Sequence, residues 1–103
     1  MAYRARYLPK AVQQVDAILS YLAARHPAAA RRVGEAISRG IERIARFPHS
    51  SRPSEVPGVR ELPIVRYPYV VFYAVDDHAR EIQVLRVRHT SQDPAHHLAD
   101  WRT

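Results

Sequence analysis

The chain has 103 residues, contains no cysteine and carries a formal net charge of +6. This length predicts a single domain over residues 1–103, and the absence of cysteine excludes disulfides and thiolate metal sites. No apolar run approaches the ~18 residues of a membrane span, and the N-terminus lacks the apolar core of a signal peptide. We therefore expect a cytoplasmic protein without membrane contact.

Arginine supplies most of the positive charge. The chain has 16 basic and 10 acidic residues, and Lys10 is the only lysine. A positive field attracts nucleic acid or an acidic protein, and the planar guanidinium group holds phosphate or carboxylate with two hydrogen bonds. A GC-rich genome also replaces lysine by arginine, so the net charge, rather than the choice of arginine, predicts an anionic partner.

The first half of the sequence predicts a strand and two helices. Residues 3–8 alternate as in a short strand, and Pro9 can occupy the first turn of a helix. Apolar residues at helical spacing predict one helix over 9–25 and, after the break at His26-Pro27, a second helix that ends at Phe47-Pro48. So short a connection predicts an antiparallel helix hairpin.

Two glycines lie inside the second predicted helix. Gly34 and Gly40 each weaken it by about 1 kcal/mol relative to alanine. We interpret them as positions where the helix packs closely against a neighbouring element, rather than as positions where the backbone of a partner approaches.

The second half predicts strands. After a polar, proline-bearing loop over 49–57, three apolar segments predict strands at about 59–65, 69–75 and 81–89. The predicted fold is α+β: an N-terminal strand, an antiparallel helix hairpin and a three-stranded antiparallel meander, with the helices packed on one face of the sheet. The other face of the sheet is expected to be partly open.

Arginines recur along these strands. Strict alternation places Arg86 and Arg88 together on one face of the last strand and Leu85 and Val87 on the other, which we assign to the core. We interpret the arginine pair either as a contact for a partner or as charge that protects an edge strand. Arg60 either contacts a partner or fixes the loop before the sheet.

The elements and motifs, in this order, resemble the RelE/ParE superfamily of bacterial toxins from type II toxin–antitoxin modules. The resemblance covers nearly the whole chain and rests on three motifs: A…D…I..Y, then G-x-R-x-L…Y-x-V-x-Y-x-V, then V-L-R-V-x-H…D. Their residues here are Ala11, Asp16, Ile18 and Tyr21; Gly58, Arg60, Leu62, Tyr69, Val71, Tyr73 and Val75; Val84 to Val87, His89 and Asp93. The segment Arg60 to Pro63 and the His89-x-x-x-Asp93 ending are similar to the ParE branch.

The resemblance to the ParE branch implies a toxin that inhibits DNA gyrase by binding, without catalysis of its own and without a cofactor. The implied partners are DNA gyrase and a cognate acidic antitoxin, whose C-terminal segment is expected to cross the helix hairpin and the sheet. Growth arrest and plasmid stabilisation are the implied consequences. The candidate residues for contact with target or antitoxin are Arg60, Arg66, Tyr69, Arg86, Arg88, His89, Asp93 and Trp101.

Two alternatives remain open. In a RelE-like, ribosome-dependent endoribonuclease that cleaves messenger RNA, Arg66 and Arg86 would hold the phosphate and His89 would transfer a proton. Only this alternative requires direct contact with nucleic acid, and two features lower it: no tyrosine follows His89, and Pro68 stands where RelE-type chains usually have glycine. The second alternative is a degenerate toxin that only binds its antitoxin.

Features near the C-terminus also have structural interpretations. His89 and Asp93 alternatively pair in a turn and close the last strand. Trp101 either packs on the domain or is left for a partner. The adjacent pair His96-His97 lacks carboxylate or cysteine support, so we expect no metal site.

Overall fold

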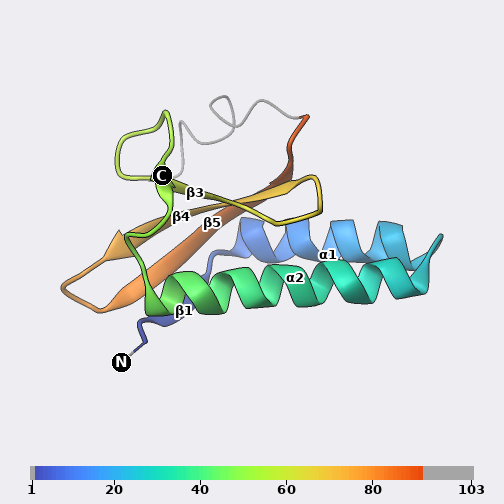
Figure 1. Ribbon diagram of the computed structural model, residues 1–103, viewed down its shortest axis with the longest axis horizontal. Coiled ribbons are helices and arrows are strands. Elements are labelled where there is room, and N and C mark those ends of the chain that lie inside the picture. Colours follow the sequence, from blue (N-terminus) through green and yellow to red (C-terminus); the bar gives the residue numbers. More distant parts are fainter. Residues whose placement is uncertain (1, 92–103) are drawn as a thin grey trace.

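The helix hairpin lies on one face of a mixed sheet in the computed structural model, which describes residues 2–91 (Figure 1). The elements are β1 (Arg4–Tyr7), α1 (Pro9–Ala23), α2 (Pro27–Arg46), β2 (Arg52–Pro53), β3 (Arg60–Pro63), β4 (Tyr69–Asp76) and β5 (Glu81–His89). The predicted α+β fold and the helix hairpin are confirmed. No helix within residues 2–91 is long and apolar enough to cross a membrane.

The sheet has the strand order β1-β5-β4-β3-β2 and contains one strand that the sequence did not predict. β1 pairs with β5 in parallel, and all other neighbouring strands are antiparallel. The additional strand, β2, pairs with Arg60 and Glu61 of β3 and lies inside the segment predicted as a loop. A two-residue strand that contains Pro53 is too short to show an alternating pattern.

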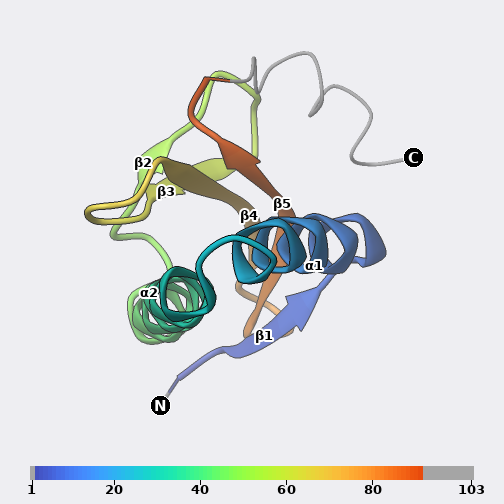
Figure 2. The same cartoon turned by 90° about the vertical axis from the view of Figure 1, so that its right-hand side faces the viewer.

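Helix α1 completes the part of β5 that β1 does not reach. β1 pairs with β5 only as far as Tyr7, which lies opposite Val84. Further along β5, the side-chain oxygen of Gln14 accepts a 2.8 Å hydrogen bond from the backbone N–H of Val87. A side chain of α1 therefore satisfies a strand donor beyond the end of β1, and Figure 2 shows α1 beside β5 and β1.

The main core lies between the helices and the sheet. Its largest buried members are Val33, Ile37, Ile41, Ile44, Leu62, Ile64, Val71, Tyr73, Ile82, Val84 and Val87. Close packing is confirmed at Gly40, where a Cβ would lie 3.1 Å from Leu62 Cδ2 and 3.2 Å from Ile64 Cδ1. At Gly34 the packing does not require glycine, because a Cβ there would lie at an ordinary 3.6 Å from Leu19.

A β-bulge interrupts the alternation of β5. Tyr73 of β4 lies opposite Val84, but the preceding residue, Phe72, lies opposite Arg86. Leu85 is therefore the extra residue on the β5 side. The side chains that follow the bulge point to the opposite faces from those that strict alternation predicts.

The bulge overturns one prediction. Leu85 and Val87 do not share the core face: Val87 packs under the helices, whereas Leu85 joins a second apolar cluster with Val59, Phe72 and Ala74 on the other face of the sheet. Because side chains alternate again after the bulge, Arg86 and Arg88 remain together on that second face. That face thus carries its own small apolar cluster.

Candidate partner-binding site

Arg86 and Arg88 form a cationic pair on the face of the sheet away from the helices. Their exposed fractions are 7% and 8%, and Arg86 Nη1 donates a 2.7 Å hydrogen bond to the backbone oxygen of Leu85. The Nε of Arg88 is buried and has no hydrogen-bond acceptor within residues 2–91. Burial lowers the pKa of Arg88, and the like charge of Arg86 lowers it further. Two cations in this environment favour an anionic group against this face.

His89 closes the last strand through a near neighbour. The Ser91 N–H donates to His89 Nδ1 at 3.1 Å, and the Ser91 hydroxyl lies 2.8 Å from the same nitrogen. The imidazole also meets the Tyr69 ring edge to face, with 5.6 Å between ring centroids. Ser91 therefore provides His89 with a turn contact of the kind that the sequence predicted for Asp93. Asp93, Trp101, His96 and His97 lie outside the described residues.

The three residues of the ribonuclease alternative do not share one surface. Arg86 faces away from the helices, whereas His89 contacts Tyr69, which packs against the core on the helix side. Arg66 lies in the connection between β3 and β4 and lines a groove against α2. A catalytic acid or base must come within hydrogen-bond reach of the reacting group, and this arrangement does not favour that convergence.

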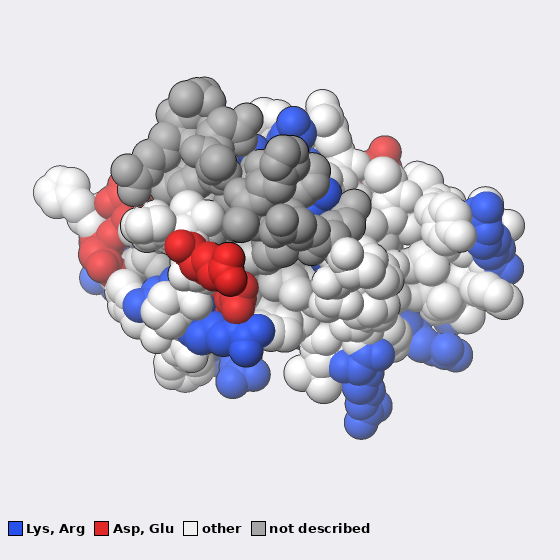
Figure 3. Space-filling model, turned by 90° about the horizontal axis from the view of Figure 1, so that it is seen from above, with Lys and Arg blue, Asp and Glu red and all other residues white. Residues whose placement is uncertain are grey.

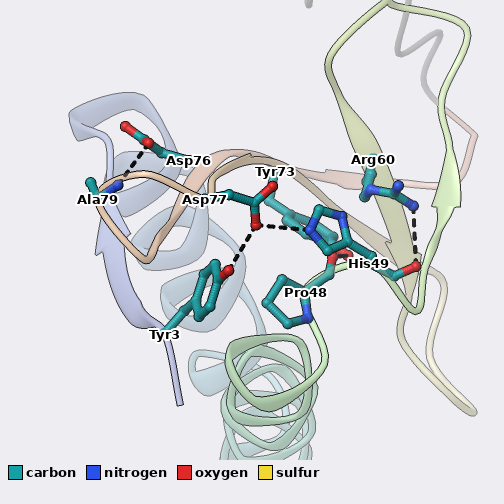
Figure 4. Close-up of polar contacts among 8 residues, drawn as sticks. All are labelled: Tyr3, Pro48, His49, Arg60, Tyr73, Asp76, Asp77 and Ala79. Atoms are coloured by element: carbon teal, nitrogen blue, oxygen red, sulfur yellow. Dashed lines mark hydrogen bonds and ion pairs between the residues drawn. The ribbon is translucent and has the colours of Figure 1, made fainter. Parts of the chain in front are cut away.

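Arg60 fixes the loop before the sheet. Its Nη1 donates to the backbone oxygens of Ser51 and His49, the latter at 3.3 Å. The Tyr73 hydroxyl donates a buried 2.9 Å hydrogen bond to the backbone oxygen of Pro48, in the same loop (Figure 4). Of the two roles that the sequence left open for Arg60, the structural one is thus present.

A polar cluster that the sequence did not indicate joins three distant segments. Asp77 Oδ1 accepts a 2.7 Å hydrogen bond from the Tyr3 hydroxyl and a 2.9 Å hydrogen bond from His49 Nε2 (Figure 4). The hydrogen bond from His49 makes the larger contribution to lowering the pKa of Asp77, and the hydrogen bond from Tyr3 lowers it further. The cluster ties the N-terminus and the loop after α2 to the turn between β4 and β5.

A groove of about 510 Å³ lies between α2 and the connection from β3 to β4. We call it the α2 groove. Its basic lining residues are Arg32, Arg39 and Arg43 from α2 and Arg66 from the connection. Sequence analysis singled out Arg66 but not the three α2 arginines. Their spacing of seven and then four residues places them along one helix face. This spacing could have been recognised in the sequence as a basic stripe on the helix.

Figure 3 shows further basic side chains on one face of the molecule. Seen from above the sheet, they lie around the rim of the molecule, while most of the visible acidic side chains lie towards the left of the view (Figure 3). Within residues 2–91, no group of three or more His, Asp or Glu side chains is placed to hold a metal ion. The surfaces described above therefore offer guanidinium groups and apolar contacts as their recognition chemistry.

Comparison with known proteins identifies the family. Residues 5–94 match the family model described as the ParE toxin of type II toxin–antitoxin system, parDE. The chain belongs to the ParE toxin family. This membership confirms the predicted RelE/ParE superfamily and identifies the chain as a toxin of the type II toxin–antitoxin class.

Individual relatives agree with this family. The chain is 32% identical over 89 residues to a protein named "Putative toxin Y4kP" from Sinorhizobium fredii, which covers 86% of this chain and 90% of that protein. It is 28% identical, with a TM-score of 0.74, to a chain of the solved chromosomal ParDE TA system from P. aeruginosa, covering 85% of this chain and 96% of that one. E. coli toxin RelE, solved in the free state with two arginines replaced by alanine, shares the fold. The TM-score is 0.69 at 13% identity, and the match covers 99% of this chain and 98% of that one.

Proposed function

We propose that this ParE-family toxin inhibits DNA gyrase by binding it and catalyses no reaction of its own. The observation that carries this proposal is the separation of Arg86 from His89 and Arg66, which leaves charged contact surfaces without a convergent acid–base site among residues 2–91. A buried arginine pair beside an apolar cluster suits contact with an acidic or polar protein surface. The match to the ParE family over residues 5–94 supports the same conclusion.

The proposal includes a cognate acidic antitoxin as the partner that neutralises the toxin. The solved relative from P. aeruginosa is a ParDE toxin–antitoxin system, and the net charge of +6 on this chain favours association with an acidic protein. Toxin and antitoxin are expected to meet in the cytoplasm. Expression of the toxin without its antitoxin then arrests growth, and a plasmid that encodes both is stabilised.

The proposal is tested by pulse-labelling of DNA and protein synthesis after induced expression, with and without co-expression of a cognate antitoxin. We expect an early fall in DNA synthesis that the antitoxin reverses. Purified toxin added to gyrase, ATP and supercoiled DNA should cause cleaved DNA to accumulate. An early fall in protein synthesis, with cleavage of ribosome-bound messenger RNA and unaffected gyrase, would instead identify the endoribonuclease. No change in either synthesis would identify a degenerate toxin.

A further inference from the structure

Four exposed arginines form a row along one face of α2, which we call the α2 stripe. Its members are Arg32, Arg39, Arg43 and Arg46. Their spacing of seven, four and three residues places them one above the other on the helix surface. From Arg32 to Arg46 the stripe is about 21 Å long, at a rise of about 1.5 Å per residue.

The α2 stripe is not neutralised by the part of the chain that the structure describes. Within residues 2–91, its four guanidinium groups make no hydrogen bond and no ion pair. Glu35 and Glu42 lie on the same helix but pair with none of them. Since a guanidinium group carries its donors in a fixed fork, the stripe offers a regular row of sites to an anionic partner.

A fifth cation faces the α2 stripe across the α2 groove. Arg66, in the connection from β3 to β4, lines the groove opposite Arg32, Arg39 and Arg43. Its φ of 74° is a left-handed conformation that residues with a Cβ rarely adopt, and such backbone strain is concentrated at functional surfaces. Figure 2 shows this connection and α2 on the same side of the molecule. The groove therefore has guanidinium groups on both of its borders.

The floor of the groove between these borders is already filled. A Cβ at Gly40 would lie 3.1 Å from Leu62 Cδ2 and 3.2 Å from Ile64 Cδ1, so no space remains there for a side chain from outside. A partner that lies across the groove meets it through the cations at its borders. Contact of this kind, with charge at regular intervals and no inserted anchor, suits a phosphate backbone.

We propose that the α2 stripe and Arg66 bind the phosphate backbone of the DNA on which gyrase acts. The phosphates of one strand follow one another at about 3.4 Å along the axis of B-DNA. Arg32 and Arg39 are about 10 Å apart along the helix, and Arg39 and Arg43 about 6 Å. These distances are close to three and two phosphate intervals, so successive arginines of the stripe can each meet a phosphate of the same strand.

This contact leaves the other arginine surface to a protein. Arg86 and Arg88 lie on the sheet face away from the helices, whereas the α2 stripe lies on the helix side. A toxin that binds gyrase through one surface and DNA through the other holds the enzyme and its substrate together. The inference rests on the proposed function, because it adds the DNA as a second partner to the gyrase contact.

The test compares two pairs of substitutions that remove the same charge. Arg39→Gln with Arg43→Gln removes two cations of the α2 stripe, and Lys10→Gln with Arg31→Gln removes two exposed cations outside it. Arg39→Lys with Arg43→Lys keeps the charge of the stripe. Binding of the full-length toxin to a duplex of about 20 base pairs is measured by fluorescence anisotropy from about 50 to 200 mM salt. Thermal melting checks that every variant is folded.

We expect the two glutamines in the stripe to weaken binding roughly 10- to 100-fold at about 100 mM salt. They should also make the slope of log affinity against log salt shallower by about 2, because each phosphate contact contributes about 0.9 to that slope. The control pair should weaken binding less than about threefold, through the general field alone, with the slope unchanged. The lysine pair should keep the slope of the wild type, and duplexes of different sequence should bind alike.

Equal losses for the two glutamine pairs, or no loss for either, would overturn the proposal. It would also be overturned if the stripe pair bound a cognate antitoxin more weakly while its affinity for the duplex stayed unchanged. Gyrase inhibition by the wild-type toxin is measured separately. A toxin that binds DNA through the stripe and leaves gyrase active would contradict the proposed target, whereas the salt slopes of the variants would still decide the role of the stripe.

Discussion

Arg39 and Arg43 on α2 differ from Arg86 and Arg88 on β5 in what surrounds each guanidinium group. The α2 pair is exposed and lines a groove with an apolar floor. The β5 pair is 7% and 8% exposed, on the sheet face that carries the second apolar cluster. An exposed arginine without an ion pair remains hydrated at little cost, whereas a buried one loses solvation that hydrogen bonds or an anion must replace.

This difference shows that one net charge describes two kinds of surface. The α2 arginines add attraction for a partner while leaving the folded state almost unaffected, since water solvates them when no partner is present. The β5 arginines are part of the packed sheet, and their mutual repulsion is built into the fold. Charge alone therefore gives the sign of the expected partner, and burial determines whether stability and binding change together.

The largest change in stability is expected at the two glycines of α2, of which Gly40 lines the α2 groove and Gly34 faces Leu19 of α1. Gly34→Ala and Gly40→Ala each gain up to about 1 kcal/mol of helix stability. Only Gly40→Ala loses all of this gain or more, because its Cβ would lie 3.1 Å from Leu62 and 3.2 Å from Ile64. We expect the two free energies of unfolding, measured by urea denaturation, to differ by about 1–2 kcal/mol, with Gly34→Ala the more stable. Equal gains would mean that the groove floor can relax around an added methyl group.

A smaller change in the free energy of unfolding is expected when one arginine of the β5 pair, Arg86 and Arg88, is replaced. Arg88→Leu retains the apolar packing of the arginine methylene groups and removes a buried cation. The Nε of that cation has no acceptor within residues 2–91. We expect the free energy of unfolding to rise by about 1 kcal/mol, because desolvation and repulsion from Arg86 are both relieved. Arg39→Leu, at an exposed position, should change it by less than about 0.5 kcal/mol. A loss of more than about 1 kcal/mol for Arg88→Leu would show that an anionic group outside residues 2–91 anchors this guanidinium.

Local spacing was sufficient to predict the elements that hold these surfaces. The helix hairpin and the last strand, Glu81–His89, follow from apolar periodicity and from proline breaks that act within a few residues. The motifs Arg60 to Pro63 and Tyr69 to Val75 were sufficient to indicate the superfamily that the family match confirms.

Predictions that depended on pairing between distant segments were less successful. The bulge at Leu85 is set by how β5 pairs with β4, and a one-residue shift of this kind exchanges the two faces of a strand. The face assignment of Val87 was wrong for this reason. The α2 groove as a whole also could not be predicted from the sequence. The helix spacing of Arg39 and Arg43 was visible, but the position of the β3–β4 connection against them is a tertiary contact.

The polar cluster at Asp77 extends the comparison to a charged group that has its partners. Its pKa is lowered in the folded state, so the stability it contributes is fully present above the ordinary aspartate pKa near 4 and is lost as the pH falls through the lower, folded-state value. We expect wild type to melt at a higher temperature than Asp77→Asn at pH 6, and the difference to narrow below about pH 4. Asp16→Asn is the control, because the exposed Asp16 carboxylate makes no hydrogen bond or ion pair within residues 2–91. A difference between wild type and Asp77→Asn that stays constant from pH 6 to pH 3 would mean that the ionised carboxylate does not hold Tyr3 and His49 together.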